Sequence, residues 1–283
     1  DVYKRQVDTQ KPVASLAPAP SIFNSANVDL VVSATDETEL VKVVGNIRNA
    51  AGAIVLPAQA AASGTSGELV IDLSSLSDGK YNLRYNALDL AGNVAPTQSF
   101  DFTVDNKAPV VTVKPESIGS DGLFRNVSFK LNDGGKVDKV VLNGVTKDLS
   151  NSVWSDLNGV KPGMFGAVEG QNTLEVYDVA GNVTIVVFTL DTTGPTATVK
   201  PESKGGEEGF YREVSFKLFD KAKVVKATLN GVEKSLSPNQ WSDLNGIKPG
   251  TFGAVEGLNT LVLEDALGNQ STHTFTLDTI KPV

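Results

Sequence analysis

Short runs of alternating apolar and polar residues dominate the chain. Apolar side chains occupy every second position in segments 28–32, 69–73, 81–87, 100–104 and 127–131. A period of two is typical of β-strands with one buried face, and the Gly, Asn, Ser and Asp residues between the runs mark turns. No window of 11 or more residues shows the 3.6-residue period of an amphipathic helix. The pattern predicts an all-β protein.

One junction sequence occurs four times and divides the chain into repeats. An aliphatic residue, Asp, three spacers and Pro recur with Asp at positions 8, 105, 191 and 278, which are 97, 86 and 87 residues apart. Residues 122–191 and 209–278 are identical at 43 of 70 aligned positions, whereas the first copy is divergent. A fixed period of this kind indicates tandem copies of one domain. We predict three units, 8–104, 105–190 and 191–277, with 1–7 an upstream remnant or cloning scar and 278–283 the start of a further repeat.

Each unit carries the sequence Asp-x-x-Gly-Asn between its last two predicted strands. The copies are Asp89–Asn93, Asp178–Asn182 and Asp265–Asn269. Asp accepts bonds from backbone N–H groups, while Gly and Asn tolerate positive φ. The sequence therefore predicts a tight hairpin turn near the end of every unit.

Two local features refine the strand prediction. Tyr81 lies where β-sandwiches often keep a corner tyrosine, and the other two units have Asn172 and Asn259 in that place. We expect those Asn side chains to make the corresponding bonds. The Ala-rich segment 50–63 contains Gly and Pro, so we expect a loop there rather than a helix.

The turns and junctions together resemble the bacterial immunoglobulin-like domains that occur as tandem repeats in secreted and cell-surface proteins. The resemblance is carried by the D-x-A-G-N turns Asp89–Asn93 and Asp178–Asn182, the variant Asp265–Asn269 and the D-x-x-x-P junctions, and it covers about residues 8 to 283. It implies three tandem Ig-like β-sandwiches in an extended array. Because members of this family act as stalks, adhesin repeats and accessory modules of large secreted enzymes, it also implies an extracellular location, secreted or attached to the cell surface or cell wall.

The amino-acid composition argues against several classes of function. Lys and Arg number 25 against 33 Asp and Glu, a net charge of −8, which argues against nucleic-acid and anionic-membrane partners. Cys is absent, and the one His, His273, corresponds to Val186 in the sister unit. A catalytic His missing from the sister copy is improbable, so we expect no enzyme. No run of 18 apolar residues is present, so we expect no membrane insertion.

A repeated Trp block is the first candidate for binding. Trp154 and Trp241 each open the sequence W-S-D-L-N-G. An exposed indole beside polar side chains can stack on the apolar face of a pyranose, which would make a glycan site. The structural alternative is that each Trp caps the end of its sandwich together with Phe165 or Phe252.

Calcium at the junctions is the second candidate. Asp178 in the hairpin turn and Asp191 at the junction both offer carboxylate oxygens near a domain boundary, and an ion there would stiffen the array. The alternative is that both residues form Asx-turns and strand caps. We expect no other cofactor.

The sequence favours a structural role. Junctions of a few residues, each with Pro, suit a semi-rigid rod, so we expect a non-catalytic spacer or adhesin stalk that is monomeric within a longer chain. The alternative is a set of carbohydrate-binding accessory modules of a larger secreted enzyme. The partners that fit are a cell-surface glycan or a protein of a host or neighbouring cell.

Overall fold

The computed structural model describes residues 8–205 and 209–281. Residues 1–7, predicted to be an upstream remnant, and the last two residues of the segment 278–283 lie outside this description. The described residues form strands, turns and loops without an α-helix. Accordingly, they include no helix with the length and apolar character of a membrane span.

The first unit consists of two sheets. One sheet has the order β1-β3-β6, with β1 (Val13–Leu16), β3 (Asp29–Thr35) and β6 (Ser66–Asp72). The other has the order β2-β8-β7-β4-β5, with β2 (Ile22–Phe23), β8 (Gln98–Val104), β7 (Gly79–Asp89), β4 (Leu40–Asn49) and β5 (Ile54–Ala61). Strand β5 shows that the loop prediction for 50–63 is wrong. It is an edge strand paired with β4 alone, and an edge tolerates Pro57, which cannot donate a backbone hydrogen bond.

The second and third units each contain one six-stranded sheet that follows the same plan. The second comprises β9 (Val110–Val113), β10 (Ile118–Ser120), β11 (Leu123–Leu142), β12 (Val145–Val160), β13 (Gly170–Asp178) and β14 (Val183–Leu190). The third comprises β15 (Thr196–Val199), β16 (Lys204–Gly205), β17 (Phe210–Leu229), β18 (Val232–Ile247), β19 (Gly257–Asp265) and β20 (Gln270–Leu277).

A long irregular strand joins the two layers of the second unit. The first half of β11 pairs with β9 over Phe129–Asn132, and its second half pairs with β13 over Val137–Leu142. Between these halves the register shifts, and Lys136 has a φ of 82°. A bulge of this kind bends a strand, so β11 serves both layers of one sandwich. The Trp block lies on its hairpin partner β12, and β17 with β18 repeats the arrangement.

Each unit has a hydrophobic core of its own. The core of the second unit contains Phe129 and Phe188, whose ring centroids are 5.2 Å apart in an edge-on contact. Phe216 and Phe275 repeat this contact at 5.1 Å in the third unit. A separate cluster fills the first unit. Burial of one such side chain stabilises a domain by about 1.5–3 kcal/mol, so each sandwich has the means to fold around its own centre.

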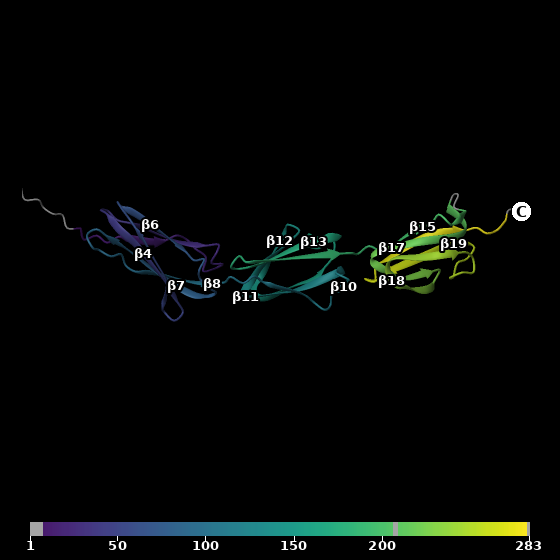
Figure 1. The fold of residues 1–283 in the computed structure, drawn as a ribbon, viewed down its shortest axis with the longest axis horizontal. Coiled ribbons are helices and arrows are strands. Elements are labelled where there is room, and N and C mark those ends of the chain that lie inside the picture. The colour runs from purple at the N-terminus through teal and green to yellow at the C-terminus, as the bar shows by residue number, and fades with distance from the viewer. Residues whose placement is uncertain (1–7, 206–208, 282–283) are drawn as a thin grey trace, which may run out of the picture.

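Figure 1 shows the three sandwiches in a row along the longest axis of the molecule, joined by short connections. The predicted fold class, all-β with three tandem sandwiches in an extended array, is confirmed.

Candidate functional site

The Asp-x-x-Gly-Asn turn fastens each unit to the junction at its start. In the second unit Oδ1 of Asp178 accepts from the backbone N–H of Asn182 at 2.8 Å, and Oδ2 accepts from the Asn182 side chain at 2.7 Å. The same Asn182 Nδ2 donates to the carbonyl oxygen of Asp105 at 2.9 Å. The predicted hairpin turn is confirmed, and it also anchors the junction. The same bond joins Asn93 to Asp8 at 3.2 Å and Asn269 to Asp191 at 3.0 Å.

The joint between the first and second units combines hydrogen bonds with one salt bridge, between Asp78 of the first unit and Lys107 of the second at 2.8 Å. Asn24, which follows β2, donates from its backbone N–H to the carbonyl of Ala180 at 3.0 Å. Its side-chain Nδ2 donates to Oδ1 of Asn182 at 2.5 Å. Both acceptors belong to the hairpin turn of the second unit. The first unit therefore docks on the turn that fastens the junction.

The joint between the second and third units uses charged side chains in the same place. Arg125 follows Phe124 as Asn24 follows Phe23, and its guanidinium donates to the carbonyl of Gly268 at 3.2 Å. Asp121 forms a salt bridge with Lys223 at 2.6 Å. The two joints share a position but differ in their chemistry.

Three carboxylates converge at the start of the second unit. One ligand atom each from Asp105, Asp133 and Asp178 lies within 4.8 Å of the others. Asp133 and Asp178 are buried, at 5% and 2% exposure. Burial raises the pKa of both carboxyls, and repulsion by Asp105 adds to the rise. A partial counter-charge comes from Lys107, which pairs with Asp78 at 2.8 Å and lowers the pKa of Asp133 slightly.

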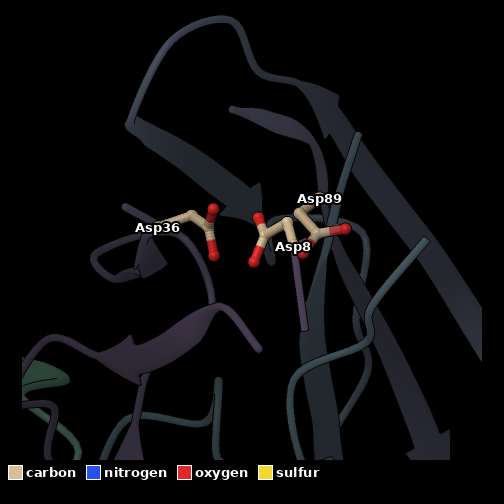
Figure 2. Close-up of side chains that lie close together, drawn as sticks. All are labelled: Asp8, Asp36 and Asp89. Atoms are coloured by element: carbon tan, nitrogen blue, oxygen red, sulfur yellow. The ribbon is translucent and has the colours of Figure 1, made fainter. Parts of the chain in front are cut away.

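A second group of this kind lies at the start of the first unit. Asp8, Asp36 and Asp89 also bring ligand atoms within 4.8 Å of one another. Figure 2 shows the carboxylate of Asp36 pointing toward that of Asp8, with Asp89 beside it. The hydroxyl of Thr38 contacts both Asp8 and Asp36, at 2.5 and 2.8 Å. Carboxylate oxygens in this density are the ligands that Ca²⁺ prefers.

A missing side chain makes room for the group in the second unit. A Cβ added to Gly135 would lie 1.8 Å from Oδ2 of Asp105. In the third unit Ala222 occupies the equivalent place, two residues after Asp220. There the carboxylate of Asp191 accepts from the hydroxyl of Thr193 at 2.9 Å. The glycine therefore leaves room for the Asp105 carboxylate in the second unit, whereas the third unit has a methyl group at this place.

The third junction holds its carboxylates differently. Burial raises the pKa of Asp220 to about 6, with added repulsion from Asp191 and Asp265. Burial also raises the pKa of Asp265. These three residues are not among the convergent groups of the part of the chain that the structure describes. Protonation of Asp220 as the pH falls below about 6 therefore relieves this repulsion.

The two residues predicted to bind calcium lie far apart. Gly170 at the start of β13 pairs with Leu190, so Asp191 lies near that end of the strand pair. Asp178 is at the other end of β13, about 26 Å away for eight residues of strand. Only Asp178 joins a convergent group, and calcium binding stays a prediction.

The sequence analysis missed the partners of Asp178. Asp36, Asp133 and Asp220 share one signal. Each directly follows the segment that pairs with the first strand of its unit and runs back to the junction. An alignment of the three units on the junction Asp would place these three residues close to one position. Their distance in sequence from the hairpin turn hides the contact.

Both Trp residues of the repeated block lie on the surface. Trp154 is 61% exposed on β12 and Trp241 is 53% exposed on β18. The ammonium of Lys130 lies 5.3 Å from the ring centroid of Trp154, and that of Lys217 lies 4.3 Å from Trp241. More than half of each indole is exposed, so neither Trp caps a core. Phe165 and Phe252 do pack against the cores of their units.

The single imidazole belongs to the last junction. His273 Nε2 lies 3.2 Å from the carbonyl oxygen of Pro195 and 3.1 Å from Ser271 Oγ. Ser271 itself bonds the same carbonyl, as Thr184 bonds Pro109 in the second unit. The histidine therefore adds one contact to a structural bond that its sister unit makes without it.

Comparison with known proteins identifies a family for part of the chain. The family described as bacterial Ig-like domain matches residues 19–106. No curated protein matches.

Solved structures that resemble the chain include tandem modules of secreted and surface proteins. The tetra-tandem repeat in the extending region of a large adhesion protein is 20% identical, with 95% of this chain and 74% of that chain covered and a TM-score of 0.27. A Ca²⁺-stabilized adhesin of an Antarctic bacterium that binds ice is 20% identical, with 96% and 75% covered and a TM-score of 0.29. The fibronectin(III)-like modules of CbhA from Clostridium thermocellum are 16% identical, with 63% and 94% covered and a TM-score of 0.34. TM-scores this low do not establish a shared function.

Proposed function

Because residues 19–106 belong to the bacterial Ig-like domain family, we propose that this protein is a non-catalytic, semi-rigid spacer within an extracellular or cell-surface bacterial protein. The proposed modules are 8–104, 105–190 and 191–277, and the segment from 278 is proposed to begin a further repeat. Such a spacer, or adhesin stalk, holds another domain away from the surface to which the protein is attached.

The contacts across the two joints carry the proposal. At each joint one unit docks on the hairpin turn of the next, through Asn24 or through Arg125. These contacts are added to short junctions that contain Pro, which has little backbone freedom. Units held in this way transmit force along the row rather than swinging freely.

Small-angle X-ray scattering of the whole chain tests the spacer role. A compact globule of 283 residues has a radius of gyration of about 19 Å, and the spacer predicts a much larger value that stays constant with temperature below unfolding. A radius near that of the globule, or a curve typical of freely jointed beads, contradicts the proposal.

We further propose that calcium stiffens the first two junctions. The observation that supports it is the convergence of buried carboxylates, Asp105, Asp133 and Asp178, beside the space left by Gly135. Buried carboxylates repel one another, and a divalent cation would remove that repulsion. The same donor set recurs at Asp8, Asp36 and Asp89.

Isothermal titration with CaCl₂ tests this part of the proposal. The two convergent groups predict two ions per chain, and Asp133→Asn should reduce the number to one. Asp220→Asn in the third unit is the matched control and should leave both ions in place. A chain that binds no calcium, or an Asp133→Asn variant with unchanged stoichiometry, contradicts calcium binding while leaving the spacer role intact.

Glycan binding is the second candidate function, and the exposure of Trp154 and Trp241 favours it. Each indole presents an apolar surface beside a lysine ammonium, an arrangement suited to a pyranose with polar or acidic substituents. Screening of the chain on a glycan array, followed by titration with Trp154→Ala and Trp241→Ala, tests it. Binding that survives both substitutions, or a chain that binds no glycan, contradicts this candidate.

A further inference from the structure

An open cavity lies at the joint between the second and third units. Its volume is about 670 Å³, and residues of both units line it. Arg125 and Lys161 come from the second unit, Thr192 from the junction and Asn269 from the hairpin turn of the third unit. Small-molecule sites have volumes of about 300–1,000 Å³. The cavity therefore has room for a ligand of the size of a monosaccharide or disaccharide.

The donor groups in this cavity lack protein partners. The ammonium of Lys161 and the side-chain amide of Asn126, which also lines the cavity, form no hydrogen bond or salt bridge with the part of the chain that the structure describes. Arg125 donates to the carbonyl of Gly268, and a guanidinium has five N–H groups. The cavity thus presents two positive charges and an amide N–H to a ligand that enters it.

The first joint closes the equivalent place with its own hydrogen bonds. There Oδ1 of Asn106 accepts from the backbone N–H and the hydroxyl of Ser25 at 2.9 and 3.0 Å, and Nδ2 donates to the carbonyl of Leu76 at 3.1 Å. At the second joint the residues in the places of Ser25 and Asn106 are Asn126 and Thr192, whose side chains form no bond with each other. The basic cavity is therefore a property of the second joint and not of the repeated fold.

The hairpin turn of the third unit adds an acceptor that lacks a donor. Asn269 is 3% exposed, and its Oδ1 has no hydrogen-bond partner among the described residues. At the first joint the equivalent oxygen, of Asn182, accepts from Asn24. Arg125 takes the place of Asn24 but bonds the carbonyl of Gly268 instead. Because a buried acceptor without a donor is costly, this oxygen favours a ligand that carries a hydroxyl.

A carboxylate beside the cavity limits the charge of the ligand. Glu169 accepts from the hydroxyl of Thr192 at 2.8 Å and from its backbone N–H at 3.2 Å. An anion with several charges would be repelled by Glu169 as well as attracted by the two cations. A single carboxylate can instead pair with the guanidinium of Arg125 through two parallel hydrogen bonds. The charges therefore favour a ligand with one carboxylate.

We propose that this cavity binds a sugar that carries one carboxylate, such as a hexuronic acid. The carboxylate pairs with Arg125 and Lys161, and the hydroxyls bond to the amide of Asn126 and to Oδ1 of Asn269. A ligand held by both units fastens the joint between them. The site is separate from the exposed Trp residues, and it does not depend on the spacer role.

Titration of the whole ¹⁵N-labelled chain with D-glucuronate, followed by NMR, tests the proposal. The signals of the Asn126 side-chain amide and of the Thr192 backbone amide should shift and saturate with a dissociation constant of about 1 mM, the affinity expected for a ligand of this size. D-Glucose, which lacks the carboxylate, and acetate, which lacks the hydroxyls, should bind at least tenfold more weakly. Equal affinities for acetate and glucuronate overturn the sugar as the ligand. The absence of a saturable shift at Asn126 and Thr192 overturns the site.

Substitutions in the cavity test the assignment, with the Thr192 amide as the signal. Lys161→Gln should weaken glucuronate binding at least tenfold, because it removes a charge-assisted hydrogen bond. Asn126→Glu places a carboxylate in the cavity and should abolish binding. The third unit has Glu213 at that position, paired with Lys204, so the fold tolerates the change.

Control variants show whether binding belongs to the cavity. Lys147→Gln removes an exposed lysine from another place in the second unit and should bind glucuronate as the wild type does. Trp154→Ala and Trp241→Ala should also leave this binding unchanged. Thermal unfolding of every variant shows whether the fold is kept. Wild-type affinity in folded Lys161→Gln and Asn126→Glu, or loss of binding in the Trp variants alone, overturns the proposal.

Discussion

Asn24 of the first unit donates its side-chain amide to Oδ1 of Asn182 in the second unit over 2.5 Å. Asn182 is 7% exposed, and its own Nδ2 is already bonded to Asp105 and Asp178. One buried amide thus links the hairpin turn, the junction backbone and the preceding unit.

Replacing Asn24 by Ala should loosen the first joint without unfolding either unit. The substitution leaves Oδ1 of Asn182 without its partner, which costs about 1–3 kcal/mol of docking free energy. Since the chain has no Cys, the pair Arg84→Cys and Thr146→Cys provides spin-label sites on the exposed surfaces of the two units. The distance distribution between the labels should broaden in the variant. An unchanged distribution would show that the remaining contacts, among them the backbone bond to Ala180 and the salt bridge between Asp78 and Lys107, hold the joint without the Asn24 side chain.

Salt should loosen the second joint. The salt bridge between Asp121 and Lys223 is solvent-exposed, at 60% and 36% of the two side chains, and such pairs are screened by ions. Labels at Thr146→Cys and Glu233→Cys should report a broader distribution in 1 M NaCl than in 50 mM NaCl. Lys223→Ala should give the broad distribution at both concentrations. A distribution that is as narrow in 1 M NaCl as in 50 mM NaCl would contradict the assignment.

Removing the corner asparagine of the second unit should destabilise that unit strongly. Asn172 is 1% exposed and bonds Val168 twice, Gly170 and Asn143, over 2.7–2.9 Å. Asn172→Ala should lower the free energy of unfolding by about 2–4 kcal/mol, because several buried groups lose their partners. In a Trp241→Phe background the fluorescence of Trp154 reports the second unit alone. A loss below 1 kcal/mol would contradict this role.

The corner residues were predictable because their signal is local. Tyr81 follows a Gly turn and donates to the carbonyl of Ser77, four residues away, at 2.9 Å. Asn172 and Asn259 make their bonds within a similar span. The hairpin turn is equally local. The predictions of the corner residues and of the hairpin turn are therefore both confirmed. Contacts between residues close in sequence can be predicted because they follow from residue type and spacing.

Strand β5 and the contact between Asp133 and Asp178 could not be predicted, because both depend on residues that are far apart in sequence. Ile54 and Val55 lie in edge strand β5, are exposed, and so show no alternation that would distinguish a strand from a loop. The carboxylate Asp133 meets Asp178 only because β11 bends in mid-strand, and a bulge has little sequence signature beyond its glycines. The family resemblance supplied the sandwich but not these contacts.

Asp220 should make the third unit more stable in mild acid. Its folded pKa of about 6 lies above the unfolded value of 3.8, so the folded state binds the proton more tightly. The stabilising effect of that proton is full below about pH 3.8 and is lost as the pH rises through 6. Asp220→Asn, which keeps an acceptor for the N–H of Ala222, should therefore stabilise the unit at pH 7 by up to about 3 kcal/mol.

The effect of Asp220→Asn must be measured with a signal that comes from the third unit alone. In a Trp154→Phe background the fluorescence of Trp241 follows chemical unfolding of that unit at each pH. The advantage of the variant over the parent should shrink as the pH falls from 7 to 4. An advantage that is independent of pH would show that the substitution acts through packing rather than through the proton.

Gly135→Ala should separate calcium binding from folding in the second unit. The third unit has Ala222 at the equivalent place, so the fold tolerates the methyl group and unfolding without calcium should change by less than about 1 kcal/mol. The methyl group would nevertheless lie 1.8 Å from the present position of Asp105 Oδ2, which must leave the group of three carboxylates. Calcium affinity at this junction should fall at least tenfold.

Gly134→Ala, whose Cβ meets no atom within 4 Å, is the matched control and should bind calcium as the wild type does. Equal affinities for the two alanine variants would remove Asp105 from the proposed ligand set.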